Sequence, residues 1–175
     1  EAAALRHPVA FDVYPYTASS TSLAARDPRE DVPVQVTNSL PHPAMAGRML
    51  ANIAAEWGVS LIEARDRLLP ATGVFHNMAE EDVRRIMAHP LSMIGSDGGP
   101  LAKKPHPRLW GTFPRVLGHY VRELGLMDLE TAIHKMTGRT AMVFGIEGRG
   151  TISPGAFADL VLLDAATVKD RSTWE

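Results

Sequence analysis

The sequence predicts an α/β fold followed by a small, separate β element. Apolar and β-branched runs alternate with helical patterns along most of the chain, as in layered α/β proteins. Residues 73–95 show the succession strand, helix, strand, which is typical of a parallel βαβ unit. Residues 150–164 change to a period of two around a Pro-Gly turn, which favours a β-hairpin.

The first part of the chain is expected to hold two strands and two helices. Residues 9–16 are rich in β-branched and aromatic types and predict a buried strand, which ends in a loop of small residues. Residues 34–37 predict a short strand. Apolar residues at helical spacing then predict a helix that ends near Gly58. Ser60, with Glu63 three residues later, predicts the start of a second helix.

The second part begins with the βαβ pattern. Residues 73–78 predict a strand, residues 80–89 an amphipathic helix with an acidic start, and residues 92–95 another strand. Because these three elements follow one another directly, we expect the two strands to pair in parallel through a right-handed crossover. A loop rich in glycine and proline, residues 98–112, precedes two further helical stretches, and Asp128 is the expected N-cap of the second.

Composition describes an ordinary globular chain of 175 residues, 45% hydrophobic and 22% charged. A net charge of −2 gives no reason to expect a nucleic acid or an anionic membrane as partner, so we predict neither. The absence of cysteine excludes disulfides and thiolate metal sites. The chain has neither an apolar run of about 20 residues nor a signal-peptide pattern, so we expect a cytoplasmic protein. Its opening residues read as the end of a helix, which indicates a fragment.

Asp97 is the first candidate for chemistry. It follows the expected strand 92–95 within Ser-Asp-Gly-Gly, and functional groups of parallel α/β folds gather at the ends of strands. A carboxylate there is suited to metal binding and to general base catalysis. Asp-Gly turns are also common without any function, and the local sequence alone favours a simple turn.

Arg108 is the second candidate, in the segment PHPRLWG. A guanidinium in so rigid a loop suits bidentate binding of a substrate carboxylate, and a surface ion pair is an equally good reading of the residues alone. The histidines lack the H-x-H and H-E-x-x-H spacings of metal sites. His76 and His106 are close enough in sequence to strand ends or to Arg108 to approach a site, in a supporting role.

The order of several motifs resembles the C-terminal part of the N-acyl-D-amino-acid deacylases, or D-aminoacylases, a branch of the metal-dependent amidohydrolase superfamily. The similarity covers nearly the whole chain, and GSDG followed by PHPR is quite specific to the branch. Residues 41–70 are most similar to the D-glutamate and D-aspartate deacylases. The motifs are DVYPYTASST, MAEEDVRRIMAHPLSMIGSDG, PHPRLWGTFPRVLGHYVRE, AIHKMTGRTAMVFGIEGRGTISPGAFADLVLLD and TVKDRSTWE.

This resemblance implies the C-terminal fragment of a (β/α)8 amidohydrolase barrel with a share of a small β-domain. Residues 1–145 would form the last part of the barrel, with its seventh strand in FDVYPY and its eighth in SMIGSD. Residues 146–175 would supply the C-terminal strands of the β-domain.

The resemblance also implies roles for four residues. Asp97 would meet the metal site and act as general base and acid, Arg108 would hold the α-carboxylate of the substrate, and Tyr14 and Ser20 would line its pocket. The implied cofactor is zinc. The implied reaction hydrolyses an N-acyl-D-amino acid, a small molecule, to a carboxylate and a free D-amino acid. Because catalytic zinc usually needs three protein ligands and the family's other ligands have no counterpart here, we expect the chain alone to be inactive.

Two other functions are compatible with the sequence. The chain could be a non-catalytic, truncated module that forms a homo-oligomer through exposed strand edges. It could also belong to a hydrolase of cyclic amides, similar to hydantoinases. The Arg108 segment argues against the second alternative, because a cyclic amide need not offer a free carboxylate.

Overall fold

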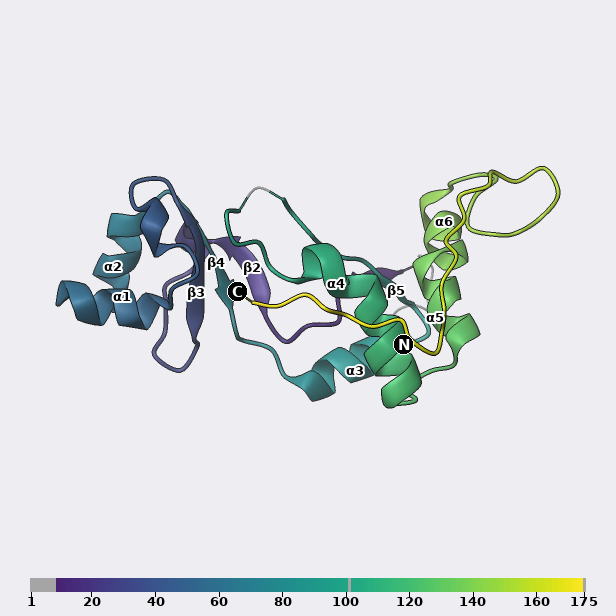
Figure 1. Ribbon diagram of the computed structural model, residues 1–175, viewed down its shortest axis with the longest axis horizontal. Helices are drawn as coiled ribbons and strands as arrows, with labels where there is room; N and C mark the ends of the chain where they lie inside the picture. Colours follow the sequence, from purple (N-terminus) through teal and green to yellow (C-terminus); the bar gives the residue numbers. More distant parts are fainter. Residues whose placement is uncertain (1–8, 101, 175) are drawn as a thin grey trace. The chain divides into compact units, whose positions relative to one another are not determined.

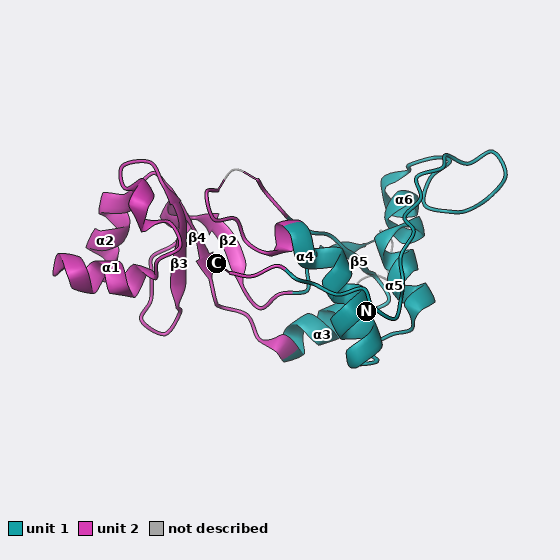
Figure 2. Ribbon diagram, viewed as in Figure 1, with its two compact units in different colours: residues 1–15, 81–97, 110–171 teal, residues 16–80, 98–109, 172–175 magenta. Residues whose placement is uncertain are grey.

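The computed structural model describes residues 9–100 and 102–174 (Figure 1). The chain divides into two compact units, each built from separate stretches of sequence (Figure 2). Unit 1 comprises residues 1–15, 81–97 and 110–171, and unit 2 comprises residues 16–80, 98–109 and 172–175.

Unit 1 is built on two short parallel strands. Strand β1 (Phe11–Val13) pairs with β5 (Ser92–Ile94), with Phe11 opposite Ser92 and Val13 opposite Ile94. All three residues of β5 are buried, which is typical of a strand covered by helices. The core around β5 contains Val83, Met87, Ile94, Val116, Leu117, Tyr120 and Ala132.

The helices of unit 1 supply most of that core. Helix α3 (Glu80–Ala88) precedes β5, and α4 (Arg108–Arg115) continues into a π-helical stretch, η4 (Val116–Glu123). Pro114 lies inside α4, where it lacks the N–H that the helix needs, and the wider π-helical turns follow directly. The last two helices of the unit are α5 (Leu129–Met136) and α6 (Gly138–Phe144).

The predicted cap of the last helical stretch is confirmed. Asp128 accepts a hydrogen bond from the backbone N–H of Thr131 at 2.7 Å and so caps α5. The stretch itself forms two helices, because Thr137 leaves the helical region with φ −132° and ψ −89°. Gly145, at φ 63°, ends α6 in the left-handed conformation that glycine adopts without strain.

Unit 2 contains a three-stranded antiparallel sheet and two helices. The strands are β2 (Ser19–Ser22), β3 (Val34–Ser39) and β4 (Ala71–Phe75), in the order β2-β4-β3. Helices α1 (Leu50–Trp57) and α2 (Leu61–Leu68) pack on the sheet, and single 3-10 turns, η2 (Leu23–Ala25) and η3 (Pro43–Met45), connect the elements. Their shared core contains Leu23, Val34, Val36, Leu50, Ile53, Ala54, Ala64, Leu68, Ala71 and Phe75.

The helix ends of unit 2 follow the sequence prediction. Gly58 ends α1 with φ 64°. Ser60 caps α2 by accepting a hydrogen bond from the backbone N–H of Glu63 at 3.2 Å. Both caps depend only on neighbouring residues, which is why the local pattern located them.

The predicted parallel pairing of residues 73–78 with residues 92–95 is wrong. Strand β4 pairs antiparallel with β2 on one edge and with β3 on the other, so neither edge is available to β5. A Cβ on Gly73 would come within 2.6 Å of Leu23 Cδ2, so glycine keeps this central strand tightly enclosed. The parallel partner of β5 is β1, which is much farther away in the sequence.

The predicted β-hairpin over residues 150–164 is not formed, and residues 146–174 contain no strand. The turn itself is present, with Gly155 at φ 84° and a hydrogen bond from Ala156 N–H to the Ser153 carbonyl at 3.1 Å. Val161 is 86% exposed and Leu162 is 101% exposed. A two-stranded hairpin is marginal without further strands to pack on, so these residues stay irregular. The small β-domain that they were expected to join stays a prediction.

None of the helices in the described part of the chain combines the length and the apolar character needed to cross a bilayer.

Candidate functional site

Asp97 follows β5 in a left-handed backbone conformation, with φ 46°. Among the described residues it is the one non-glycine residue with a positive φ. Aspartate adopts this region more readily than most residues, at a cost of about 1 kcal/mol. Asp97 is an exposed residue, and it closely follows a buried strand. The strained conformation is therefore an observed feature of the residue that the sequence singled out, as is common at functional sites.

Tyr14 lies at the same edge of the parallel pair. It directly follows β1, and Val13 is paired with Ile94 of β5. A further hydrogen bond, from Gly95 N–H to the Val13 carbonyl at 3.2 Å, extends the pairing beyond the strands. The half-buried Tyr14 and the exposed Asp97 thus both lie just beyond the carboxyl ends of neighbouring strands. This edge is where parallel α/β proteins place their functional groups.

Arg108 is the first residue of α4, where the sequence predicted a loop, and it is only 5% exposed. Its Nη2 donates a hydrogen bond to the backbone carbonyl of Ser20 at 3.4 Å. The structure therefore brings two predicted site residues together within unit 2, and the contact uses the main chain of Ser20. A guanidinium cannot be deprotonated in a protein, so its burial places a permanent positive charge in a desolvated setting. Such a charge strengthens binding of an anionic ligand.

His106 holds the segment that leads into Arg108. Its Nε2 donates a hydrogen bond to the carbonyl of Ala18 at 3.0 Å, and its Nδ1 accepts one from the backbone N–H of Arg108 at 3.0 Å. This pair of partners requires the neutral tautomer with the proton on Nε2. The imidazole is 5% exposed, and both of its nitrogens have partners. His106 thus orders the backbone at Arg108, and its supporting role in a site stays a prediction.

Electrostatics favour the same neutral state. Burial, the largest cause, lowers the pKa of His106 to about 4. The hydrogen bond to Ala18 opposes the shift, and the charges of Arg108 and His76 add to it. Burial also lowers the pKa of His76. Near neutral pH His106 is thus uncharged, and the positive charge of Arg108 lies beside a neutral imidazole.

The sequence reasoning missed Trp174, which contacts His106 ring to ring. Their ring centroids are 4.7 Å apart in an edge-to-face arrangement, at an interplanar angle of 70°. The tryptophan ring also lies 5.0 Å from His76 and 6.1 Å from Tyr16, again between centroids. No periodicity or spacing signals this contact, because Trp174 lies in an irregular segment far along the chain.

The described residues do not form a metal centre by themselves. They include no group of three or more histidine, aspartate or glutamate side chains arranged to hold an ion. Asp97 offers a single carboxylate, and a catalytic zinc site usually has three protein ligands. The described residues therefore do not suffice for zinc by themselves, and the origin of further ligands stays a prediction.

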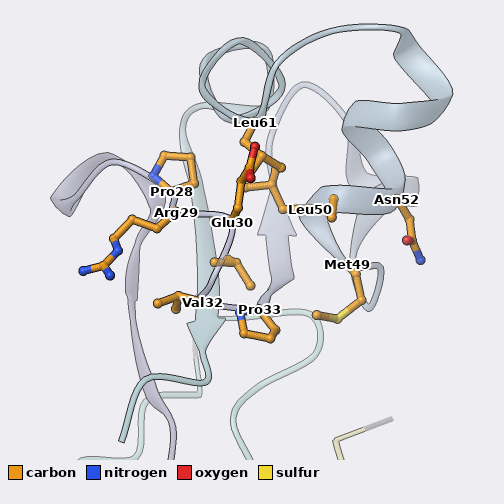
Figure 3. A pocket seen from close by; sticks show the side chains of 11 residues that line it. Pro28, Arg29, Glu30, Val32, Pro33, Met49, Leu50, Asn52 and Leu61 are labelled. Carbon is orange, nitrogen blue, oxygen red and sulfur yellow. The ribbon is translucent and has the colours of Figure 1, made fainter.

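A pocket of about 430 Å³ in unit 2 contains none of the predicted site residues (Figure 3). It lies between the loop 28–33 and the start of α1, and Leu50, Val32 and Leu61 give it an apolar lining. Figure 3 shows Arg29 pointing away from the other labelled side chains, and this arginine forms an exposed ion pair with Asp31 at 2.5 Å. The pocket thus lacks the buried charge that distinguishes the surroundings of Arg108.

Comparison with known proteins identifies the family. The model of the amidohydrolase family matches residues 21–173. N-acyl-D-glutamate deacylase of Alcaligenes xylosoxydans xylosoxydans is 50% identical over 167 residues, which are 95% of this chain and 34% of that protein. D-aminoacylase of the same organism is 51% identical over 175 residues, which are 100% of this chain and 36% of that protein. The chain thus spans about a third of the length of these relatives.

Solved structures of the same kinds of enzyme also match this chain. The N-acyl-D-glutamate deacylase of Bordetella bronchiseptica, complexed with zinc and a phosphonate mimic of the tetrahedral intermediate, matches with a TM-score of 0.90 and 50% identity. That match covers 94% of this chain and 35% of the other. A D-aminoacylase structure matches with a TM-score of 0.94 and 50% identity over 99% of this chain and 36% of its own length. Another D-aminoacylase structure concerns a binuclear metal centre. The fold and the sequence together show that this chain belongs to the amidohydrolase family.

Proposed function

We propose that this chain is a segment of a metal-dependent hydrolase that removes the acyl group from N-acyl-D-amino acids. The observation that carries the proposal is an identity of about half, over nearly the whole chain, to N-acyl-D-glutamate deacylase and D-aminoacylase. The buried guanidinium of Arg108 supports it, because every N-acyl-D-amino acid carries an α-carboxylate. A cyclic amide does not require such a group.

In this reaction Arg108 binds the α-carboxylate through its guanidinium, and Tyr14 and Ser20 line the substrate pocket. Asp97 supplies the proton transfers. Its carboxylate takes a proton from the water that attacks the amide carbon, and it returns that proton to the nitrogen as the C–N bond breaks. The products are a carboxylate and the free D-amino acid, so atoms and protons balance. An exposed aspartate just after a strand is suited to this exchange with substrate.

Zinc is present in the solved N-acyl-D-glutamate deacylase. In the proposed enzyme Asp97 would be the contribution of this chain to the metal site, and the other ligands would come from the rest of the protein. The chain would correspond to the final strands of the amidohydrolase barrel, with β1 and β5 as neighbours in it. The chain alone would then lack turnover.

Assays of the full-length protein containing this chain test the proposal. The zinc-loaded protein is given N-acetyl-D-glutamate, N-acetyl-D-aspartate and N-acetyl-D-alanine, each beside its L-enantiomer, and release of the free amino acid is measured. We expect turnover of at least one D-substrate in clear preference to its L-form. Turnover of hydantoin or dihydrouracil with none of the N-acetyl-D-amino acids would overturn the proposal in favour of a cyclic-amide hydrolase.

A further inference from the structure

The chain returns to unit 2 with residues 172–175, after more than sixty residues in unit 1, where residues 110–171 lie. The returning segment Ser172–Trp174, here called the C-terminal clamp, contacts the two residues that precede Arg108. Residues 172–174 belong to no helix or strand, so hydrogen bonds of regular secondary structure do not hold them in unit 2. The residues that the clamp contacts therefore indicate its function.

Ser172 fixes the peptide group that precedes Arg108. Its hydroxyl donates a hydrogen bond to the carbonyl of Pro107 at 3.2 Å. The Tyr16 hydroxyl lies 3.4 Å from Ser172 Oγ. Since Ser172 donates its single hydroxyl proton to the Pro107 carbonyl, the Tyr16 hydroxyl is the donor in this second hydrogen bond. The carbonyl oxygen of Pro107 belongs to the peptide bond whose nitrogen is that of Arg108, so this chain of contacts sets the orientation of the peptide plane.

Trp174 fixes His106, the residue that precedes Pro107. Its ring packs edge-to-face on the imidazole of His106, and its backbone carbonyl accepts a hydrogen bond from Gln35 Nε2 at 3.2 Å. Gln35 lies on β3, and its amide also donates to the carbonyl of Gly47 at 2.9 Å. The tryptophan is therefore anchored to the sheet of unit 2 and covers one side of His106. The ring of His106 in turn receives the backbone N–H of Arg108.

Three consecutive residues are thus held by separate contacts. His106 is held by Ala18 and Trp174, Pro107 by Ser172, and the Arg108 side chain by the carbonyl of Ser20. We propose that Ser172 and Trp174 are positioning residues for Arg108, which hold its backbone so that the guanidinium meets the substrate carboxylate in a fixed orientation. This inference rests on the proposed function, since it assigns the clamp to carboxylate binding in that reaction.

The clamp would act on carboxylate binding through the orientation of the Arg108 guanidinium. A guanidinium binds a carboxylate best when its N–H groups form a planar fork with the two oxygens. A tilt of the peptide plane between Pro107 and Arg108 would move the guanidinium and weaken this ion pair. A positioning error of about 1 Å can cost on the order of a hundredfold in rate or binding. Loss of the clamp removes one side of the support for residues 106–108 and leaves the Ser20 contact in place. We therefore expect weaker carboxylate binding with little change in the chemical step.

The test uses the full-length, zinc-loaded protein with the best of the three N-acetyl-D-amino acids and its α-carboxamide. Trp174→Ala and Ser172→Ala should raise KM for the carboxylate substrate, about ten- to a hundredfold for the tryptophan, with kcat within about threefold of the wild type. Their KM for the carboxamide should stay near that of the wild type. Trp174→Phe keeps an aromatic ring on His106 and should restore most of the lost affinity.

Trp57→Ala is the matched control. Trp57 lies in the same unit and contacts a histidine ring, that of His42, at 5.1 Å between centroids. Because Trp57 packs against the core of unit 2, Trp57→Ala should lower the melting temperature, and we expect it to leave KM unchanged. An equal rise of KM in Trp57→Ala and Trp174→Ala, or no rise in Trp174→Ala, would overturn the positioning role and leave the clamp a purely structural anchor.

A readout independent of turnover separates this inference from the proposed function. The ring protons of His106, followed by NMR against pH, should titrate at higher pH in Trp174→Ala than in the wild type, because its imidazole becomes more hydrated. If the wild type lacks deacylase activity, the proposed function fails, and with it the role of the clamp in carboxylate binding. If the wild type is active and His106 titrates identically in both proteins, the inference fails while the proposed function stands.

Discussion

His106 Nδ1 accepts a hydrogen bond from the backbone N–H of Arg108 at 3.0 Å, so one residue of the PHPR motif fixes the main chain of another. The bond exists only while Nδ1 is unprotonated. Protonation would turn this nitrogen into a donor that faces another donor. The charge state of a buried histidine and the position of the candidate carboxylate-binding arginine are therefore linked.

This link predicts a pH dependence of stability. The pKa of His106 is lowered by burial from 6.5 to about 4, so the unfolded chain binds the proton more readily than the folded chain between these values. The free energy of unfolding should be at its full value above pH 6.5 and fall as the pH drops toward 4, by up to about 3 kcal/mol from this residue. Urea unfolding at several pH values measures it.

The control for this experiment is a second histidine. His106→Gln removes one titrating group and should reduce the slope between pH 6.5 and 4, while His76, whose pKa is also lowered, keeps its own share; stability at neutral pH should be lower. His134→Gln, at an exposed position of α5, is the matched substitution with which the slope of His106→Gln is compared. Equal slopes in the wild type and in His106→Gln would contradict the assignment.

The positive φ of Asp97 predicts two inactive variants that differ in stability. Removing the carboxylate in Asp97→Gly and in Asp97→Ala should abolish turnover of the full-length protein, because no group is left to transfer the proton. Asp97→Gly should nevertheless be more stable than Asp97→Ala by about 1 kcal/mol, since glycine adopts a positive φ without strain. Both variants lack the same side-chain contacts, so their difference isolates the backbone term. Equal melting temperatures would argue against strain at this position.

The isolated 175-residue chain should show no deacylase activity even with added zinc. The described residues offer no complete set of metal ligands, and one carboxylate is too few for a catalytic zinc. Measurable turnover of N-acetyl-D-glutamate, N-acetyl-D-aspartate or N-acetyl-D-alanine by the purified chain would contradict this expectation.

The same chain should associate with itself. Strands β1 and β5 form a sheet of two strands, so in the described residues each keeps an outer edge without a partner strand. Gel filtration over a range of concentrations should show oligomers that dissociate on dilution. A monomer at all concentrations, with a single cooperative melting transition, would count against association through these edges.

Features that depend on neighbouring residues were predictable from the sequence. Gly58, Ser60 and Asp128 mark helix ends through contacts within a few residues, and the structure has each of them in that role. The position of Asp97 just after a strand was predictable for the same reason. Its glycine-rich surroundings are a strong local signal.

Features that depend on distant partners were not predictable from local patterns, although the resemblance implied that FDVYPY and SMIGSD form neighbouring strands. Strand β4 has the pattern of a strand, but its pairing with β2 and β3 is decided by how unit 2 closes around it. The partner of β5 is β1, and no local rule selects it. Trp174 reaches His106 across an irregular segment, so neither a spacing nor a period announces the contact. In each case the pairing is a property of tertiary packing.

Substitution of Arg108 is a direct test of whether this buried guanidinium binds the α-carboxylate of the substrate. In the full-length protein, Arg108→Ala should raise KM for the best N-acetyl-D-amino acid by about a hundredfold or more, with a much smaller change in kcat, and Arg108→Lys should recover only part of the loss. KM for the matching α-carboxamide should be nearly the same in the wild type and in both variants. An unchanged KM for the carboxylate substrate in Arg108→Ala would contradict the account.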